Sequence, residues 1–299
     1  MKNLLTICCL SATLACATAT AETPLQLASL DRGDRPAAST GMDIWKALRP
    51  GKLKLRSAAA LVVDESGNEV YAKQADDPMP IASITKLMTA MVILDSALPM
   101  QEKITITKAD RDLIQLTGSR LEYGAKLSRG ELLQLALIAS ENRAANALAR
   151  SWPGGREAFI AAMNRKAQSL HMQDSLFSDP AGLDAGNIAS ARDLVKMVRA
   201  ATRYPFIRKA TTTSTISVRP YRGRGELRYV NTNRLLKNKT WEIRLSKTGY
   251  LNEAGRCLAM QAEIVDHPLT IVLLNSFGKL TPFGDSNRIR KWIEGGTGS

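Results

Sequence analysis

The chain has 299 residues, of which 44% are hydrophobic and 23% are charged. This is the composition of a globular protein with one large domain or two interleaved subdomains, and it excludes disordered and fibrous proteins. The formal net charge of +13 favours anionic surroundings or an anionic partner.

The first 21 residues have the features of a secretory signal peptide. Lys2 supplies a positive charge, the run 4–19 is apolar or small, and Ala19-Thr20-Ala21 offers small residues for cleavage. A membrane anchor is the alternative, but the run is shorter and more polar than the roughly 20 apolar residues of a spanning helix. We expect residues 1–21 to be removed on export and residues 22–41, which are polar and contain Pro and Gly, to form a flexible leader.

The cysteines and histidines argue against disulfide, metal and triad chemistry. Three of the four cysteines lie in the predicted signal peptide: Cys8, Cys9 and Cys16. Only Cys257 remains after cleavage, and its apolar neighbours predict a small buried side chain. His171 and His267 are isolated and fit neither a zinc-ligand nor a Ser-His-Asp spacing. No metal and no cofactor are therefore expected.

Two strands and a buried helix are predicted after the leader. Residues 57–63 and 69–73 have the composition of strands and are joined by the turn 65–68, which makes a hairpin. From Ser83 to about Leu98, apolar residues face nearly every side of a helix, as expected for a helix in the centre of a core.

The middle of the chain has the pattern of successive helices. Ser128 and Glu131 have the spacing of a capping box, which predicts a helix over 129–139. Further helices are predicted for residues 143–150, 156–170 and 191–202.

After residue 212 the pattern returns to strands. Strands are predicted for residues 241–247, 256–264 and 269–276, followed by a short amphipathic helix over 286–294. Strands at both ends favour an α/β (α+β) fold, in which an antiparallel sheet is flanked by terminal helices and an all-helical subdomain at about 86–202 is inserted. We expect this domain to span residues 42–295 without a separate C-terminal domain.

Candidate chemistry begins with Ser83-Ile84-Thr85-Lys86. A hydroxyl and an amine three residues apart lie on one face at the start of a helix. The amine can accept the serine proton if burial or neighbouring positive charge keeps it neutral, and free N–H groups at the helix start favour developing negative charge. By itself the motif is weak, because a serine that only caps a helix gives the same pattern.

Two further motifs strengthen this interpretation. Ser140-Glu141-Asn142 follows a predicted helix and supplies a hydroxyl and an amide, although such residues also serve ordinary turns. Lys247-Thr248-Gly249 is predicted at the end of a strand, where a cation and a hydroxyl can bind a carboxylate and glycine lets a substrate approach the backbone. The alternative for Lys247 is a solvated strand end.

The three motifs, in this order and with similar separations, resemble the active-site signature of the penicillin-binding proteins and serine β-lactamases. The resemblance covers roughly residues 45–280 and looks like the low-molecular-mass D,D-peptidases, through Gly118–Leu121, Leu132–Asn146 and Phe177–Asp184. It implies a β-lactamase/transpeptidase-like fold.

The resemblance also implies a role for each motif residue. Ser83 would form the acyl-enzyme, Lys86 would accept its proton, and Ser140 would relay a proton to the leaving amine. Asn142 would hold the substrate amide. Lys247 and Thr248 would bind the carboxylate beyond the scissile bond, and Gly249 would let the substrate lie close to the strand. The backbone N–H group of Tyr250 would form an oxyanion hole together with that of Ser83.

The sequence departs from the β-lactamase pattern at two places. Glu141 stands where those enzymes generally carry Asp or Gly, and its carboxylate would raise the pKa of Lys86 unless it points away, as we expect. No Glu-x-x-Leu-Asn segment lies between Ser140 and Lys247, where class A β-lactamases keep their deacylating glutamate. Rapid penicillin hydrolysis is therefore disfavoured.

Within the family, the chain looks like the shorter D-alanyl-D-alanine endopeptidases of the penicillin-binding protein 7 type. This implies hydrolysis of D-alanyl-diaminopimelate cross-links in peptidoglycan and covalent inhibition by β-lactams. A D-Ala-D-Ala carboxypeptidase that trims pentapeptide stems is the first alternative. A non-catalytic peptidoglycan- or β-lactam-binding protein is the second.

The positive charge is concentrated between Arg203 and Lys247, where twelve Lys or Arg residues stand against Glu226 and Glu242. No nucleic-acid recognition motif is visible, and an exported protein seldom meets nucleic acid. Carboxylate-rich peptidoglycan stems and anionic membrane surfaces are the favoured partners, and a solvated basic face is the alternative. The expected location is the periplasm.

Overall fold

A computed structural model describes residues 44–297 of the chain. The predicted signal peptide (1–21) and leader (22–41) lie outside these residues. None of the helices in the described part is long and apolar enough to cross a membrane.

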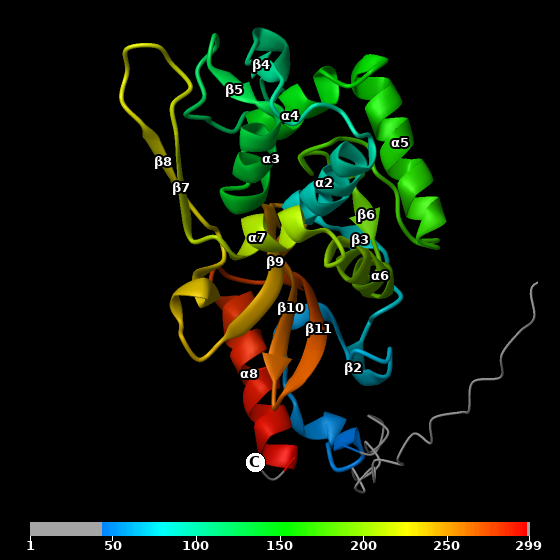
Figure 1. Cartoon of the computed structure of the whole chain (residues 1–299). Helices are drawn as coiled ribbons and strands as arrows, with labels where there is room; N and C mark the ends of the chain where they lie inside the picture. The colour runs from blue at the N-terminus through cyan, green and yellow to red at the C-terminus, as the bar shows by residue number, and fades with distance from the viewer. Residues whose placement is uncertain (1–43, 298–299) are drawn as a thin grey trace, which may run out of the picture. The chain divides into compact units, whose positions relative to one another are not determined.

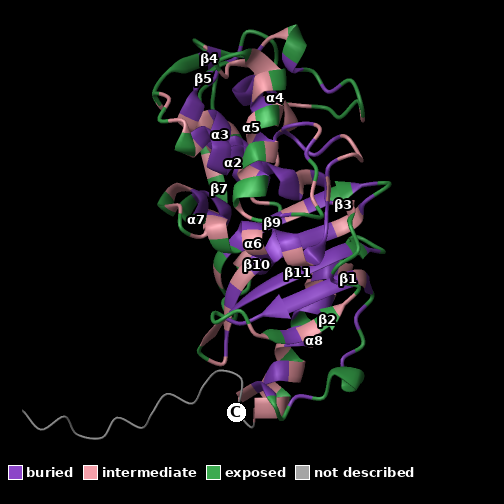
Figure 2. Ribbon diagram, turned by 90° about the vertical axis from the view of Figure 1, so that its right-hand side faces the viewer, coloured by how far each residue is buried: buried purple, intermediate pink, exposed green. Residues whose placement is uncertain are grey.

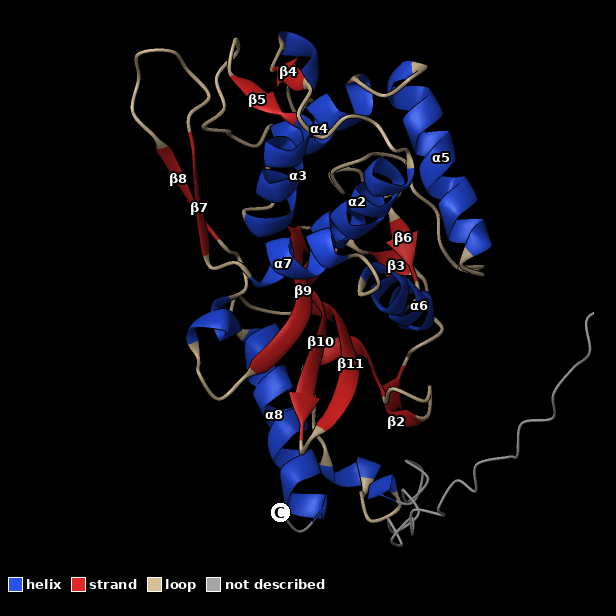
Figure 3. Cartoon of the chain, in the orientation of Figure 1, coloured by secondary structure: helices blue, strands red, loops and turns tan. Residues whose placement is uncertain are grey.

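A five-stranded antiparallel sheet is the centre of the fold (Figure 3). Its strand order is β2 (Glu69–Lys73), β1 (Ser57–Val63), β11 (His267–Ser276), β10 (Gly255–Ile264) and β9 (Glu242–Leu251). The N-terminal strand β1 pairs with the C-terminal strand β11, with Ser57 opposite Ser276. The predicted assembly of the sheet from the two ends of the chain is confirmed.

Both faces of the sheet are buried, and each strand contributes to two cores because its successive side chains point in opposite directions. Leu61 and Val272 belong to one core, whereas Val62 and Ile271 belong to the other. Figure 2 shows how completely β10 and β11 are covered. This explains why these strands have continuous apolar runs rather than a strict alternation.

Helices cover the two faces. Helix α8 (Thr281–Thr297) contributes Ile289 and Ile293 to one core, and α6 (Ala191–Ala201) contributes to the other. The helical segment between β2 and β9 contains α2 (Lys86–Asp95), α3 (Arg129–Ile138), α4 (Asn142–Arg150), α5 (Gly155–Ser169), α6 and α7 (Pro205–Thr212). Residues 86–93 of α2 are all buried, which confirms the predicted central helix (Figure 1).

Short elements connect these layers. The 3-10 turns are η1 (Pro50–Lys52), η2 (Ala82–Thr85), η3 (Lys108–Asp110) and η4 (Arg234–Lys237). Three two-stranded ribbons pair β3 (Met79–Pro80) with β6 (Ile188–Ala189), β4 (Lys103–Thr105) with β5 (Lys126–Ser128), and β7 (Thr215–Val218) with β8 (Leu227–Val230).

The residues of the predicted capping box, Ser128 and Glu131, form the expected hydrogen bonds. The Ser128 hydroxyl accepts from the Glu131 N–H at 3.1 Å, and the Glu131 carboxylate accepts from the Ser128 N–H at 2.7 Å, so the capping box is confirmed. The limits of two strands, β1 and β2, are those predicted.

Other predictions were wrong in detail. Strand β9 continues to Leu251, so Lys247-Thr248-Gly249 lies inside a strand rather than at its end. Helix α8 begins at Thr281, five positions before the predicted start. Helix α7 was not predicted, because its β-branched end, Thr211-Thr212, has the composition of a strand.

Candidate functional site

Ser83 lies in the 3-10 turn η2, which leads from β3 into α2. Two glycines allow other segments to pack against this turn. A Cβ on Gly182, whose φ is +73°, would stand 2.0 Å from the Ala82 carbonyl oxygen. A Cβ on Gly249 would stand 2.8 Å from the Ile81 oxygen and 3.1 Å from the Ser83 nitrogen. Gly249 is therefore required by the packing of β9 against the turn, a role that the sequence did not reveal.

Lys86, the first residue of α2, is fully buried beside Ser83. Its Nζ donates to Ser83 Oγ at 2.8 Å, to Asn142 Oδ1 at 2.7 Å and to the Ala181 carbonyl oxygen at 2.5 Å. The amine is therefore held on the serine by a side chain and a carbonyl from two distant segments. The predicted pairing of Ser83 and Lys86 has the geometry of a nucleophile with its base.

Burial lowers the pKa of Lys86 to about 7, because the charged amine loses its hydration. The carboxylates of Asp179, Glu141 and Asp112 oppose this shift and raise the pKa. The net result leaves a large fraction of neutral amine near pH 7, which is the state that can accept a proton.

Within residues 44–297, the Glu141 carboxylate accepts no side-chain hydrogen bond from Ser83, Lys86 or Lys247. It caps α4 and accepts from the Arg143 N–H at 3.2 Å. We expected Glu141 to point away from Lys86. Its hydrogen bond is indeed made to helix α4, but its negative charge still raises the pKa of Lys86.

Ser140 and Lys247 form a second hydroxyl and amine pair. Lys247 Nζ donates to Ser140 Oγ at 3.0 Å and to the Thr248 carbonyl oxygen at 2.9 Å. Ser140 has a φ of +59°, which turns the loop between α3 and α4 toward the site. Lys247 is 1% exposed, so it is not a solvated strand end, and burial together with the charge of Lys86 lowers its pKa.

Asn142 connects the site to a neighbouring loop. Its Oδ1 accepts from Lys86, and its Nδ2 donates to Thr117 Oγ1 at 2.9 Å. The Thr117 hydroxyl in turn donates to the buried Asp112 carboxylate at 2.7 Å. The amide is therefore oriented by partners on both sides.

The end of β9 borders the site through Thr248 and Tyr250. The Thr248 hydroxyl donates to the Thr232 hydroxyl at 2.6 Å. Tyr250 is 49% exposed, and its hydroxyl donates to Asn252 Oδ1 at 2.8 Å. Its side chain therefore lies at the rim.

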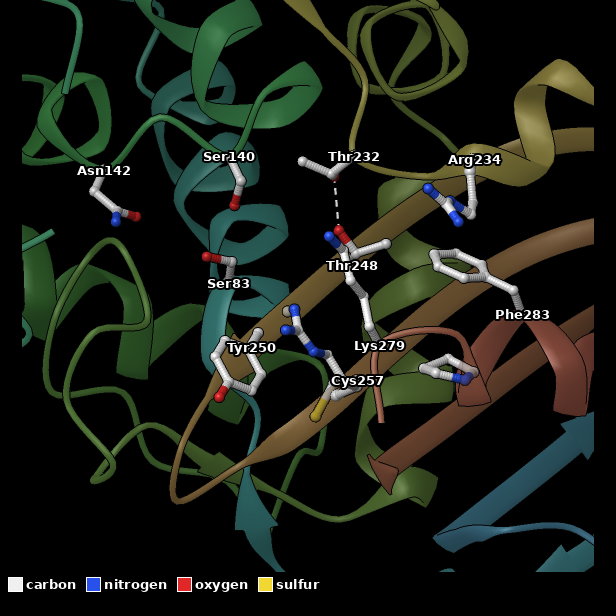
Figure 4. Close-up of a pocket in the computed structure, with 13 residues that line it drawn as sticks. Ser83, Ser140, Asn142, Thr232, Arg234, Thr248, Tyr250, Cys257, Lys279 and Phe283 are labelled. Atoms are coloured by element: carbon white, nitrogen blue, oxygen red, sulfur yellow. Dashed lines mark hydrogen bonds between the residues drawn. The ribbon is translucent and has the colours of Figure 1, made fainter. Parts of the chain in front are cut away.

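A cavity of about 410 Å³ brings these residues together. Its lining includes six of the predicted residues: Ser83, Ser140, Asn142, Thr248, Gly249 and Tyr250. Figure 4 shows the hydroxyls of Ser83 and Ser140 facing one another, with Thr248 beside them. The two other predicted residues, Lys86 and Lys247, are buried and reach Ser83 and Ser140 through hydrogen bonds.

The segment 179–184 supports the site and was not assigned a role from the sequence. The buried Asp179 carboxylate accepts four successive backbone N–H groups, those of residues 181–184, at 2.6–2.8 Å. This loop presents the Ala181 oxygen to Lys86. An Asp followed by Pro-Ala-Gly is a signal for such a side-chain-capped turn, and it could have been recognised.

The hydroxyls of Ser83 and Ser140 line a cavity large enough for a peptide segment, and each is hydrogen-bonded to a buried amine. One hydroxyl can attack a carbonyl while its amine accepts the proton, and the second can carry a proton to a departing group. The arrangement is suited to acyl transfer.

Comparisons with known proteins agree with this chemistry. Residues 46–278 match the model of a family described as D-alanyl-D-alanine carboxypeptidase. A D-alanyl-D-alanine endopeptidase from Pseudomonas aeruginosa is 44% identical, over 84% of this chain and 81% of the relative. An Escherichia coli protein of the same name is 43% identical, over 81% of this chain and 79% of the relative.

The fold is also similar to solved structures. The Streptomyces K15 DD-transpeptidase matches with a TM-score of 0.75 and 26% identity, over 81% of this chain and 98% of that chain. A penicillin-binding protein homolog from Mycobacterium tuberculosis matches with a TM-score of 0.73 and 26% identity, over 80% of this chain and 91% of that chain. The expected transpeptidase-like fold is confirmed.

Proposed function

The chain belongs to the D-alanyl-D-alanine carboxypeptidase family and is a serine hydrolase, and from this premise we propose that it is a peptidoglycan D,D-endopeptidase. The observation that carries the proposal is the network in which Lys86 contacts Ser83 and Asn142 while Lys247 contacts Ser140, around one cavity. We propose residues 42–295 as the peptidase domain, with the helical subdomain at about 86–202.

The proposed reaction has two steps. Ser83 Oγ attacks the carbonyl of a D-alanyl residue and gives its proton to neutral Lys86, while the backbone N–H groups of Ser83 and Tyr250 stabilise the oxyanion. As the bond to the leaving amine breaks, the proton held by Lys86 passes through Ser140 to that amine, so Lys86 is neutral again and an ester on Ser83 remains. Water then attacks the ester, which releases the D-alanyl carboxylate and restores Ser83 and Lys86.

The remaining residues are proposed to position the substrate. Asn142 would hold the amide of the acyl donor through its Nδ2. Lys247 and Thr248 would bind the carboxylate next to the scissile bond, and Gly249 would let the substrate lie along β9. In a cross-link this carboxylate belongs to the D-centre of diaminopimelate, so one site can accept either a cross-link or a terminal D-alanine.

The two relatives above are named endopeptidases, which supports cross-links as the first substrate. A D-Ala-D-Ala carboxypeptidase activity is the second candidate, supported by the description of the matched family and by a Bacillus subtilis carboxypeptidase that is 30% identical. A pure binding protein is disfavoured, because binding alone requires neither a nucleophile nor an amine with a lowered pKa.

The substrate assignment is tested with purified muropeptides. Cross-linked dimers joined through diaminopimelate should be converted to monomers by the full chain without its signal peptide. Pentapeptide monomers serve as the competing substrate. If pentapeptides lose D-alanine while dimers stay intact, the order of the two activities is reversed.

The rate at which benzylpenicillin acylates the enzyme should depend on pH through Lys86. The neutral amine is the base, so the rate should rise with pH and level off above the Lys86 pKa of about 7. Below that pKa the rate should fall about tenfold for each pH unit. Stopped-flow or quenched acylation between about pH 5 and pH 9 measures this profile. A rate that is constant from pH 5 to pH 8 would show that Lys86 is not the base.

We also propose export to the periplasm through cleavage of residues 1–21, and contact of the basic stretch with the sacculus or an anionic membrane surface. The β7–β8 hairpin carries four arginines of this stretch and projects from the helical layers (Figure 1). Arg219 pairs with Glu226 at 2.9 Å and Arg224 with Glu122 at 2.8 Å. Arg222 and Arg228 are exposed and make no ion pair within residues 44–297.

Replacing Arg222 and Arg228 by Gln should weaken co-sedimentation with purified sacculi about fivefold at low salt, because two unpaired charges are lost. The difference should shrink as salt screens the remaining charges. The matched control is Lys52→Gln with Lys291→Gln, which removes two exposed charges elsewhere. If both variants and the parent sediment equally at low salt, the hairpin is not part of the surface that contacts the sacculus.

A further inference from the structure

Three cations line the catalytic cavity without a role in the proposed reaction: Arg234, Arg256 and Lys279. Arg256 already makes a cation–π contact, because its guanidinium lies 3.5 Å from the centre of the Tyr250 ring. Arg234 and Lys279 are exposed and have no ion pair or hydrogen bond from their side chains to any residue between 44 and 297. These two charges are therefore available to a ligand.

Arg234 lies beyond the residues that are proposed to bind the carboxylate next to the scissile bond. It stands two positions after Thr232, whose hydroxyl contacts the Thr248 hydroxyl. In Figure 4, Ser83, Ser140 and Asn142 lie on one side of Thr248, and Arg234 and Phe283 lie on the other. Lys279 reaches the same cavity from the loop between β11 and α8. If the carboxylate next to the scissile bond binds at Thr248 as proposed, the two cations border the part of the cavity into which the leaving group would extend.

The two candidate substrates differ in that leaving group. A terminal D-alanine has one carboxylate and a methyl group, and the proposed function already assigns that carboxylate to Lys247 and Thr248. The leaving group of a cross-link is a whole stem peptide, which continues past the diaminopimelate D-centre and carries further carboxylates. Guanidinium and ammonium groups at the rim fit those carboxylates.

We propose that Arg234 and Lys279 form an acceptor-stem subsite, which binds the additional carboxylates of the departing peptide and favours cross-links over pentapeptides. This inference rests on the proposed function, since it names what distinguishes the two substrates at the same catalytic centre. Half-buried Phe283 provides an apolar wall between the two cations for the side-chain methylenes of diaminopimelate.

The double variant Arg234→Gln, Lys279→Gln tests the subsite. The ratio of kcat/KM for cross-linked dimers to kcat/KM for pentapeptides should fall about fivefold or more, because two rim contacts that only the dimer makes are lost. The Lys52→Gln, Lys291→Gln variant loses the same charge outside the cavity and should keep the parent ratio. Thermal melting checks that both variants fold. A parent-like ratio in the folded double variant, or an equal fall in the control, would overturn the subsite.

A second measurement does not depend on endopeptidase turnover. The free stem tetrapeptide, which is the departing product, should protect Ser83 from benzylpenicillin, and the double variant should need about fivefold more peptide for equal protection. If the parent cleaves no dimers but this difference is found, the proposed function fails and the subsite stands. If dimers are cleaved and protection is equal in parent and variant, the subsite fails and the proposed function stands.

Discussion

Replacing Ser83 by alanine should reduce the hydrolysis of cross-linked muropeptides by about 10⁴-fold or more, because removal of a nucleophile eliminates the covalent route and leaves only binding and oxyanion contacts. Stability should change little. Lys86 loses its contact to Ser83 Oγ but keeps Asn142 Oδ1 and the Ala181 oxygen, so its amine remains bonded.

Three measurements separate this outcome from misfolding. Turnover of dimers gives the catalytic loss, thermal melting gives the folded state, and binding of uncleaved dimers shows that the cavity is intact. A Ser83→Ala variant that melts like the parent and retains more than about a hundredth of its activity would contradict the covalent mechanism.

Replacing Asp179 by alanine should destabilise the protein by about 4 kcal/mol, because four backbone N–H groups, three of them buried, lose their acceptor at about 1–3 kcal/mol each. These groups belong to residues 181–184, and the side chain of Asn187 also donates to the same carboxylate. Without Asp179 the loop that presents the Ala181 oxygen to Lys86 loses its anchor.

Denaturant unfolding measures this loss, with Asp184→Ala as the matched control. Asp184 lies in the same loop and is also an aspartate, but its carboxylate accepts only the Gly186 N–H within the described residues, so about 1 kcal/mol is expected. Similar losses in the two variants would show that the Asp179 hydrogen bonds are not the source of the stability.

Asp179→Asn provides a readout that a purely structural role would not change. The Asp179 charge raises the pKa of Lys86, so its removal should move the rising limb of the acylation profile to lower pH. An unchanged limb in a folded variant would mean that Asp179 acts on the loop alone.

Short-range signals in the sequence predicted much of the fold. The capping box at Ser128 and the hairpin of β1 and β2 depend on residues close in sequence, and both are found. The strands β10 and β11 are long apolar runs bounded by turn residues, which is why they were predicted without knowledge of their partners. Helix α7 was missed because its β-branched end has the composition of a strand, and the end of β9 was missed because the turn signal after Lys247 proved to lie inside the strand.

Seven candidate residues were predicted from three motifs and Tyr250 from the family resemblance, and the structure brings all eight to one cavity or to buried positions beside it. The partners that tune these residues were not predictable in the same way. Lys86 meets Asn142 and the Ala181 oxygen across separations of 56 and 95 residues. Thr232 reaches the site through the hydrogen bond from the Thr248 hydroxyl, Arg234 lines the same cavity, and no motif marks either residue.

The most direct test of the covalent mechanism is intact-mass spectrometry of the chain without its signal peptide after brief exposure to benzylpenicillin, followed by peptide mapping. We predict one persistent addition of the mass of the antibiotic, located on Ser83. Intact penicillin with no adduct would contradict the acyl-enzyme and favour a binding protein, whereas rapid loss of penicillin with no adduct would indicate a β-lactamase.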